Sequence, residues 1–270
     1  MDDTWSLVDF TVRHTDGELI SDSLWNLGVV AIEERTSITG FITLRTSLGD
    51  DPSNAIASVA QMFPSAVAEI VHVPRAVADT WRQHATPTRV NETLSLVPAW
   101  LTPDVTGDYL LIEPLDTFGL GNHPTTVLAL RLALSVTQDD STIFDLGCGS
   151  GVLAVGLAKL KQCTVKVFDI ADSAREAVRL NSELNGVQGI EWCQGIEGTE
   201  SDVVLANILS PVLISESTSI INGVRPGGFI VLSGMRDEQV VLVLEHFTQC
   251  EEVTRESLDG WTAVALQRRN

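Results

Sequence analysis

The stretch Ile143-Phe-Asp-Leu-Gly147-Cys-Gly149-Ser-Gly151-Val152 decides the fold of this chain. Its apolar beginning is typical of a buried strand, and the residues from Val152 to Lys161 favour a helix. Three glycines at alternate positions allow the backbone to turn sharply and to approach a ligand closely. The first turn of the helix offers free N–H groups to a carboxylate or phosphate. The pattern therefore predicts a strand, a ligand-binding turn and a helix.

An acidic residue stands at the end of the next predicted strand. Residues 164–168 form that strand, and Asp169 follows about 20 residues after the glycine turn. A carboxylate at this place can accept hydrogen bonds from both ribose hydroxyls of a nucleoside. We therefore predict a nucleoside-cofactor site built from Gly147, Gly149, Gly151 and Asp169.

The spacing of the glycines distinguishes two classes of nucleoside cofactor. A nicotinamide-binding turn, G-x-G-x-x-G, has its third glycine three residues after the second, whereas Gly151 follows Gly149 by two. With Asp145 before the first glycine, the run reads D-x-G-x-G-x-G, which resembles motif I of the S-adenosylmethionine-dependent methyltransferases. The spacing thus favours S-adenosylmethionine over NAD. A glycine-rich turn without a ligand is the structural alternative.

Two further segments carry candidate site residues. Residues 202–207 read as an apolar strand that ends in Asn207, at the edge where ligands bind in such sheets. Its amide can donate and accept hydrogen bonds with a ligand, or it can cap the next helix. Upstream, Gly119-Leu-Gly-Asn-His-Pro-Thr-Thr126 precedes a predicted helix. A hydroxyl of Thr125 or Thr126 can cap that helix or contact a ligand.

Together these segments resemble the ribosomal protein L11 methyltransferases of the PrmA type, which carry F-G-T-G-T-H-P-T-T, D-x-G-C-G-S-G and N-I-L in this order. Leu120 and Asn122 replace two threonines of the family's loop. The resemblance implies S-adenosylmethionine as cofactor. The family's cofactor contacts fall on the following residues: Thr126, Gly147, Asp169 and Asn207.

The resemblance also implies a chemistry, the methylation of amines in ribosomal protein L11, at lysine ε-amines and at the N-terminal α-amine. We hypothesise that Asn207 is the catalytic residue and holds the acceptor amine. Another protein or a small molecule is the alternative acceptor. An adenine methyltransferase would place an aromatic residue shortly after Asn207 to stack on the base, whereas Ile208 and Leu209 follow here. A fold kept only as a binding module is the non-enzymatic alternative.

The order of predicted elements indicates three parts of the chain. Residues 1–73 show a β-α-β-β-α-β order, typical of a small ferredoxin-like α+β domain. Residues 74–98 are expected to form a linker helix and a connecting strand, and residues 99–270 the methyltransferase domain. From residue 141, alternating strands and helices predict an α/β fold with a Rossmann-like seven-stranded sheet. Its strands are expected at 142–146, 164–169, 190–193, 202–206, 228–233, 251–257 and 261–267.

Composition narrows the partners. The chain has 36 acidic and 17 basic residues among 270, a net charge of −19. Because phosphate contacts need clustered Lys and Arg, we expect no direct nucleic-acid binding. The acidity fits a basic protein partner, and it equally fits a need for solubility or a saline habitat.

Targeting and metal-binding patterns are missing from the sequence. It shows no signal-peptide pattern and no apolar run near the ~20 residues of a membrane span. Its four cysteines are scattered without a C-x-x-C pair, so we expect neither a disulfide framework nor a metal site. These features predict a cytoplasmic protein without a membrane anchor, which we expect to be monomeric.

Overall fold

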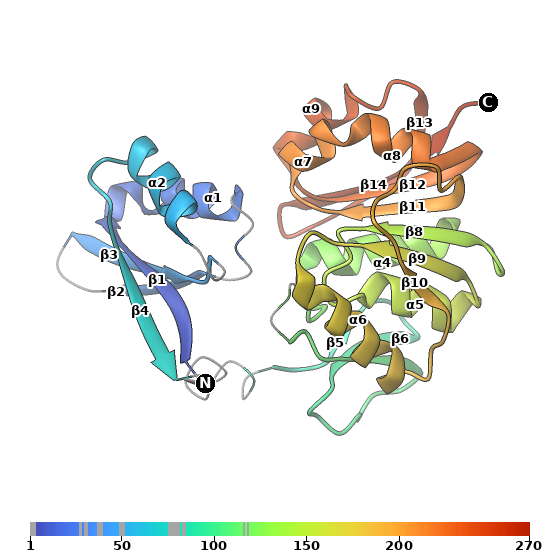
Figure 1. Cartoon of the computed structure of the whole chain (residues 1–270), viewed down its shortest axis with the longest axis horizontal. Helices are drawn as coiled ribbons and strands as arrows, with labels where there is room; N and C mark the ends of the chain where they lie inside the picture. Colours follow the sequence, from blue (N-terminus) through green and yellow to red (C-terminus); the bar gives the residue numbers. More distant parts are fainter. Residues whose placement is uncertain are drawn as a thin grey trace. The chain divides into compact units, whose positions relative to one another are not determined.

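The chain folds into two compact units, Met1–Ala85 and Thr86–Asn270 (Figure 1). The computed structural model describes the following residues: 4–26, 29, 32–36, 40–48, 52–74, 82, 85–115, 117 and 119–270. Most of the predicted linker helix lies outside the described residues. The division at 1–73, 74–98 and 99–270 therefore stays a prediction.

The first unit is a four-stranded antiparallel sheet with two helices. Its elements are β1 (Thr4–Arg13), η1 (His14–Asp16), α1 (Gly17–Asn26), β2 (Ile32–Thr36), β3 (Phe41–Thr46), α2 (Ser53–Met62) and β4 (Val67–Pro74). The strand order is β2-β3-β1-β4, and each neighbouring pair is antiparallel. This confirms the predicted ferredoxin-like order, because two β-α-β halves interleave their strands in one sheet.

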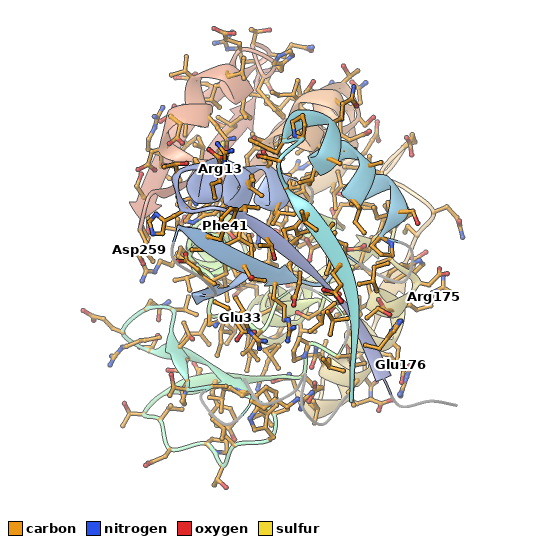
Figure 2. The ribbon with its side chains drawn as sticks, turned by 90° about the vertical axis from the view of Figure 1, so that its left-hand side faces the viewer. Arg13, Glu33, Phe41, Arg175, Glu176 and Asp259 are labelled. Carbon is orange, nitrogen blue, oxygen red and sulfur yellow. The ribbon has the colours of Figure 1, made fainter. Side chains whose placement is uncertain are left out.

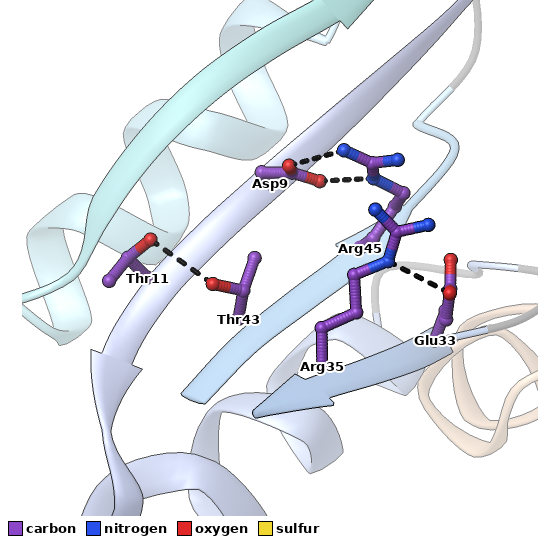
Figure 3. A network of polar contacts seen from close by, with 6 residues as sticks. All are labelled: Asp9, Thr11, Glu33, Arg35, Thr43 and Arg45. Carbon is purple, nitrogen blue, oxygen red and sulfur yellow. Dashed lines mark hydrogen bonds and ion pairs between the residues drawn. The ribbon is translucent and has the colours of Figure 1, made fainter. Parts of the chain in front are cut away.

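The sheet of the first unit has one apolar and one polar face. Val8, Phe10 and Val12 alternate along β1 and are buried in the core with residues of α1, α2 and β3. Alternation places the polar residues of the same strands on the opposite face. There the Asp9 carboxylate accepts two hydrogen bonds from Arg45, each of 2.6 Å (Figure 3).

The polar face extends to the end of the sheet. Thr11 and Thr43 pair across β1 and β3, and Arg35 binds Glu33 on β2 (Figure 3). Arg13 and its cross-strand partner Phe41 are both exposed (Figure 2). Such a sheet is typical of antiparallel folds in which helices cover one face only.

The second unit contains a seven-stranded sheet, as predicted. Its strands are β8 (Thr142–Leu146), β9 (Thr164–Phe168), β10 (Ile190–Trp192), β11 (Ser201–Asn207), β12 (Val224–Arg236), β13 (Cys250–Leu258) and β14 (Trp261–Arg268). Their order is β10-β9-β8-β11-β12-β14-β13. The first five are parallel, whereas β14 runs antiparallel to both of its neighbours. The carboxyl ends of the parallel strands therefore share one edge.

Helices cover both faces of this sheet (Figure 1). They are α4 (Pro124–Val136), α5 (Val152–Lys161), α6 (Asp172–Leu184), α7 (Ser210–Ser215), α8 (Ser217–Gly223) and α9 (Val240–Leu244). Ile143 packs in the cluster that contains α4 and α5, while its neighbour Phe144 packs with α7, α8 and α9. This alternation along β8 explains why the central strands are apolar on both sides.

The helices that follow β11 and β12 are short. Two helices, α7 and α8, follow β11 and meet at Glu216. The helix α9 begins only at Val240, because β12 continues to Arg236 and a 3-10 turn, η3 (Asp237–Gln239), follows it.

The connecting strand predicted within residues 74–98 is instead a hairpin. It comprises β5 (Thr88–Arg89) and β6 (Leu94–Pro98), and β6 pairs in parallel with β7 (Asp108–Ile112). The Asn91 side-chain oxygen accepts hydrogen bonds from the N–H groups of Thr93 and Leu94, both at 2.9 Å. This Asx turn reverses the chain.

The buried amide of Asn181 joins β7 to the glycine turn. Its Nδ2 donates to the carbonyls of Glu113 (2.9 Å) and Ser150 (2.8 Å), and its Oδ1 accepts from the Glu113 N–H (2.8 Å). Asn181 on α6 is fully buried. The side chain therefore fixes the turn against α6 and the segment after β7.

We predict that Asn181→Ala lowers the unfolding free energy by about 3 kcal/mol, because it leaves buried backbone groups without partners. Ser182→Ala is the control. Its hydroxyl donates to the Val178 carbonyl of the same helix, so we expect a change of about 0.5 kcal/mol or less. Urea unfolding measures both. Equal, small losses in the two variants would contradict the role of Asn181.

Candidate functional site

The glycine turn has a backbone conformation that other residues rarely adopt. Gly147, Gly149 and Gly151 have φ angles of 74°, 53° and 77°, in the left-handed region. A Cβ on Gly147 would also approach the Ile208 side chain to less than 3.0 Å, and one on Gly151 would lie 2.8 Å from Val178. The predicted strand, turn and helix are therefore present, and the turn requires its glycines.

Asp169 is bonded to the same turn. Its Oδ2 accepts a hydrogen bond from the Gly149 N–H and its Oδ1 accepts one from the Ala171 N–H, both at 2.8 Å. The carbonyl of Phe168, the last residue of β9, accepts from the Gly147 N–H at 2.8 Å. The acidic residue and the turn thus form one hydrogen-bonded unit at the carboxyl edge of the sheet.

A pocket of about 570 Å³ opens beside Asp169. Its lining residues come from the ends of β9 and β10 and from the start of α6: Phe168, Asp169, Ile170, Asp172, Arg175, Trp192 and Gln194. Ile170 is 94% exposed, and the Arg175 guanidinium (Figure 2) lies 5.0 Å from the centre of the Trp192 ring. The pocket is of a size that holds a small organic ligand.

Sequence reasoning missed this pocket. An apolar residue directly after the acidic one, Ile170 after Asp169, was an available signal, since an exposed isoleucine beside a carboxylate at a strand end can pack against a ligand. Trp192 carried no comparable signal, because only the parallel pairing of β10 with β9 brings it to the pocket.

The segment before α4 is organised by His123, and Phe118 of the same segment lies outside the described residues. His123 caps the helix: its Nδ1 accepts a hydrogen bond from the Thr125 N–H at 3.3 Å. Burial, and after it the charge of Arg236, lowers the pKa of His123 to about 4, so its ring is neutral near pH 7. The Thr125 carbonyl accepts a hydrogen bond from the Ser233 hydroxyl at 2.9 Å.

Two buried polar groups on β8 and α4 lack hydrogen-bond partners among the described residues. They are the Thr126 hydroxyl and both carboxylate oxygens of Asp145, whose residues are 0% and 1% exposed. Burial raises the pKa of Asp145 to about 7. The Ala154 N–H, which faces the carboxylate without forming a hydrogen bond of normal geometry, offsets part of this shift, and the charge of Asp169 adds to it. Unpaired buried groups are costly, so such groups indicate a place for a ligand.

Asn207 ends β11 at the same edge of the sheet. It pairs with Ser233 of β12, and the preceding Ala206 pairs with Leu146, the residue before the glycine turn. Asn207 is half-buried. No protein hydrogen bond of its side chain occurs within the described part of the chain, so the amide can bind a ligand.

The structure thus brings the predicted site residues to one edge. A hydrogen bond links Gly149 to Asp169. Asn207 directly precedes Ile208, whose side chain lies against Gly147. Thr126 directly follows Thr125, whose carbonyl accepts a hydrogen bond from Ser233. Asp145 is a further candidate site residue. It is the acidic residue of the sequence motif, but the sequence alone did not indicate a role for it in the site. Among the described residues, no cluster of His, Cys, Asp and Glu could hold a metal ion, and no helix is long and apolar enough to cross a bilayer.

Comparisons with known proteins point to one family. A family model described as ribosomal protein L11 methyltransferase (PrmA) matches residues 4–269. The chain is 41% identical over 166 residues to a ribosomal protein L11 methyltransferase of Dechloromonas aromatica, covering 60% of this chain and 56% of the relative. It is 29% identical over 202 residues to that of Oceanobacillus iheyensis, covering 71% and 64%. The matches thus span less than two-thirds of these curated relatives.

A solved structure supports the fold. The crystal structure of a ribosomal protein L11 methylase from Lactobacillus delbrueckii subsp. bulgaricus superposes with a TM-score of 0.63 at 24% sequence identity. The match covers 69% of this chain and 100% of that one.

We predict that Asp145→Asn stabilises the ligand-free protein, and more so at high pH. The folded carboxyl keeps its proton up to a pH of about 7, whereas the unfolded one loses it near 3.8. The folded state therefore loses stability as the pH rises through this window. The gain from Asp145→Asn should be larger at about pH 8 than at about pH 4, by on the order of 3 kcal/mol. Urea unfolding at both pH values checks this, and an equal gain at both would contradict it.

Proposed function

The chain belongs to the PrmA family of ribosomal protein L11 methyltransferases, and on this premise we propose that it transfers methyl groups from S-adenosylmethionine to amines of ribosomal protein L11. The acceptors are lysine ε-amines, and the N-terminal α-amine is a further acceptor. The observation that carries the proposal is the glycine turn bonded to Asp169, with the unpaired buried groups of Asp145 and Thr126 on the adjoining elements.

The residues at the edge fit the nucleoside end of this cofactor. A carboxylate has about four lone-pair sites, and backbone N–H groups occupy two of those of Asp169. The remaining sites would accept the two ribose hydroxyls. Gly147, Gly149 and Gly151 would let the cofactor approach the backbone, and the exposed side chain of Ile170 would cover the base.

The unpaired buried groups fit the amino-acid end. The cofactor's methionine part carries an ammonium and a carboxylate. Asp145 would hold the ammonium, which compensates a buried negative charge, and the Thr126 hydroxyl would donate to the carboxylate. Asn207, on the other side of the turn, would then lie beside the sulfur.

When bound, S-adenosylmethionine would supply a methyl group on a positively charged sulfur: the acceptor nitrogen would form a bond to the methyl carbon in line with the breaking C–S bond, and S-adenosylhomocysteine would leave as the neutral thioether. The acceptor lysine must be neutral to attack. With an ordinary pKa near 10.4, roughly one in two thousand lysines is neutral at pH 7. The Asn207 amide oxygen would accept an N–H of the neutral amine and aim its lone pair at the methyl, so that positioning provides most of the rate gain. An amide is no base, so the proton leaves to water.

Charge supports a basic protein as the acceptor. The net charge of −19 attracts a lysine-rich protein and repels nucleic acid, so direct nucleic-acid binding is no part of the proposal. We place the protein in the cytoplasm, where ribosomal proteins are made in bacteria, and propose that it acts as a monomer.

We predict that Asp169→Asn raises the Kd for S-adenosylhomocysteine by about 10- to 100-fold, because hydrogen bonds to a charged acceptor contribute about 1.5 to 3 kcal/mol. Calorimetry measures the Kd. Asp139→Asn is the matched control: this side chain is 75% exposed in the loop before β8, at the opposite edge of the sheet. Equal affinities in the two variants would contradict the ribose role.

We predict that the protein transfers label from S-adenosylmethionine to purified ribosomal protein L11. Mass mapping of the product should place the methyls on lysines and on the N-terminal amine. Asn207→Ala should lower kcat by about 100-fold or more at saturating cofactor. Cofactor binding without transfer to L11 would exclude this acceptor. A normal rate in Asn207→Ala would exclude the role of the amide.

A further inference from the structure

Ile208 occupies a narrow space between two glycines, Gly147 in the turn after β8 and Gly234 on β12. It is the residue between Asn207, which ends β11, and Leu209, which caps α7. A Cβ on Gly147 would approach the Ile208 Cγ2 methyl to less than 3.0 Å, and a Cβ on Gly234 would lie 2.7 Å from the Ile208 carbonyl carbon. The side chain therefore fills the space beside the glycine turn, and its backbone lies directly against β12.

Gly234 reaches Ile208 because β12 bulges at this point. The pairing of β12 with β14 shifts register between Leu232 and Met235, and Gly234 has a φ of +88°. Bulges of this kind bend a strand and change the direction of its side chains, and they are frequent beside active sites. A residue with a Cβ would collide there with backbone, which cannot move aside as a flexible side chain can.

The bulge also connects Ile208 to the threonine segment. Ser233, directly before Gly234, pairs with Asn207 and donates a hydrogen bond to the Thr125 carbonyl. β12 thus fixes the end of β11 and the start of α4 at the same time. The Ile208 side chain connects this arrangement to Gly147, next to the pairing of Ala206 with Leu146.

The branched shape of the Ile208 side chain suits it to hold two segments of the chain at a fixed distance. A β-branched side chain has few accessible rotamers, so its Cγ2 methyl has a nearly fixed position relative to the backbone. The pairing of Ala206 with Leu146 fixes the two strand ends, and the Ile208 methyl lies between the glycine turn and the chain just after Asn207. A change at that methyl should therefore shift the Asn207 amide relative to the turn. A shift of about 1 Å between reacting groups can cost about 100-fold in rate.

We propose that Ile208 is a positioning residue, which sets the position of the Asn207 amide relative to the methyl donor. It does so through the contact of its Cγ2 methyl with Gly147 and the contact of its backbone with Gly234. The inference rests on the proposed function, because it assigns the donor to the glycine turn and the acceptor to Asn207. Ile208 itself touches neither reactant in this role.

Two substitutions separate this role from simple packing. Ile208→Leu keeps the volume and removes the Cγ2 methyl, whereas Ile208→Val keeps that methyl and removes Cδ1. Ile214→Leu is the matched control, since Ile214 on α7 packs against the same core cluster, while the atoms nearest to both glycines belong to Ile208. For each variant, kcat for methylation of L11, the Kd for S-adenosylhomocysteine and thermal stability are measured.

Ile208→Leu should lower kcat by about 10- to 100-fold, with a Kd and stability that match those of Ile214→Leu. Ile208→Val should keep most of the wild-type rate although it leaves a larger void than Ile208→Leu, because the contact between the methyl on Cβ and Gly147 remains. Equal rates for Ile208→Leu and Ile208→Val, or an equal loss of rate in Ile214→Leu, would overturn the proposal.

A second measurement keeps the proposal testable if L11 is not the acceptor. The side-chain amide signals of Asn207 in NMR spectra should shift on addition of S-adenosylhomocysteine to the wild type and to Ile208→Val, and should shift much less in Ile208→Leu. The same shift in all three proteins would overturn the positioning role. Absence of L11 methylation with the predicted pattern of shifts would overturn the proposed acceptor alone.

Discussion

The hydrogen bond from the Gly149 N–H to the Asp169 carboxylate is the interaction on which the rest of the site depends. It forms only because the turn after β8 takes a left-handed conformation at Gly147, Gly149 and Gly151. This backbone path brings the end of β9 beside the start of α5. The pocket next to Asp169 and the contact with Ile208 follow from the same path.

Around this turn, polar side chains are buried at a cost in stability. Asp145 and Thr126 are buried without hydrogen-bond partners among the described residues, and burial raises the pKa of Asp145 to about 7. The Thr137 hydroxyl at the C-terminal end of α4 is also buried without a partner in the described part of the chain, whereas the buried Asn181 amide is hydrogen-bonded. Asp145 and Thr126 differ from Thr137 in that they adjoin the glycine turn and the segment before α4, where a ligand could supply their partners, since stability is often lower where function requires it.

The sequence predicted the parts of the fold that local patterns control. Glycine spacing identified the turn, apolar runs identified the central strands of the second unit, and the position of Asp169 after β9 followed from the alternation of strands and helices. What depends on tertiary contacts was not predictable. The break at Asn91, the bulge at Gly234 and the burial of Asp145 each require knowledge of the neighbouring strands. Asn207 was recognised, yet the contacts of the next residue, Ile208, could be seen only in the folded chain.

A crystal structure of the protein with S-adenosylhomocysteine tests the central claim most directly, that the edge formed by β8, β9 and β11 is the cofactor site. The account predicts the ribose hydroxyls on Asp169, the amino group beside Asp145 and the sulfur facing Asn207. A ligand bound away from the glycine turn, or one that leaves Asp145 and Thr126 unpaired, would contradict it.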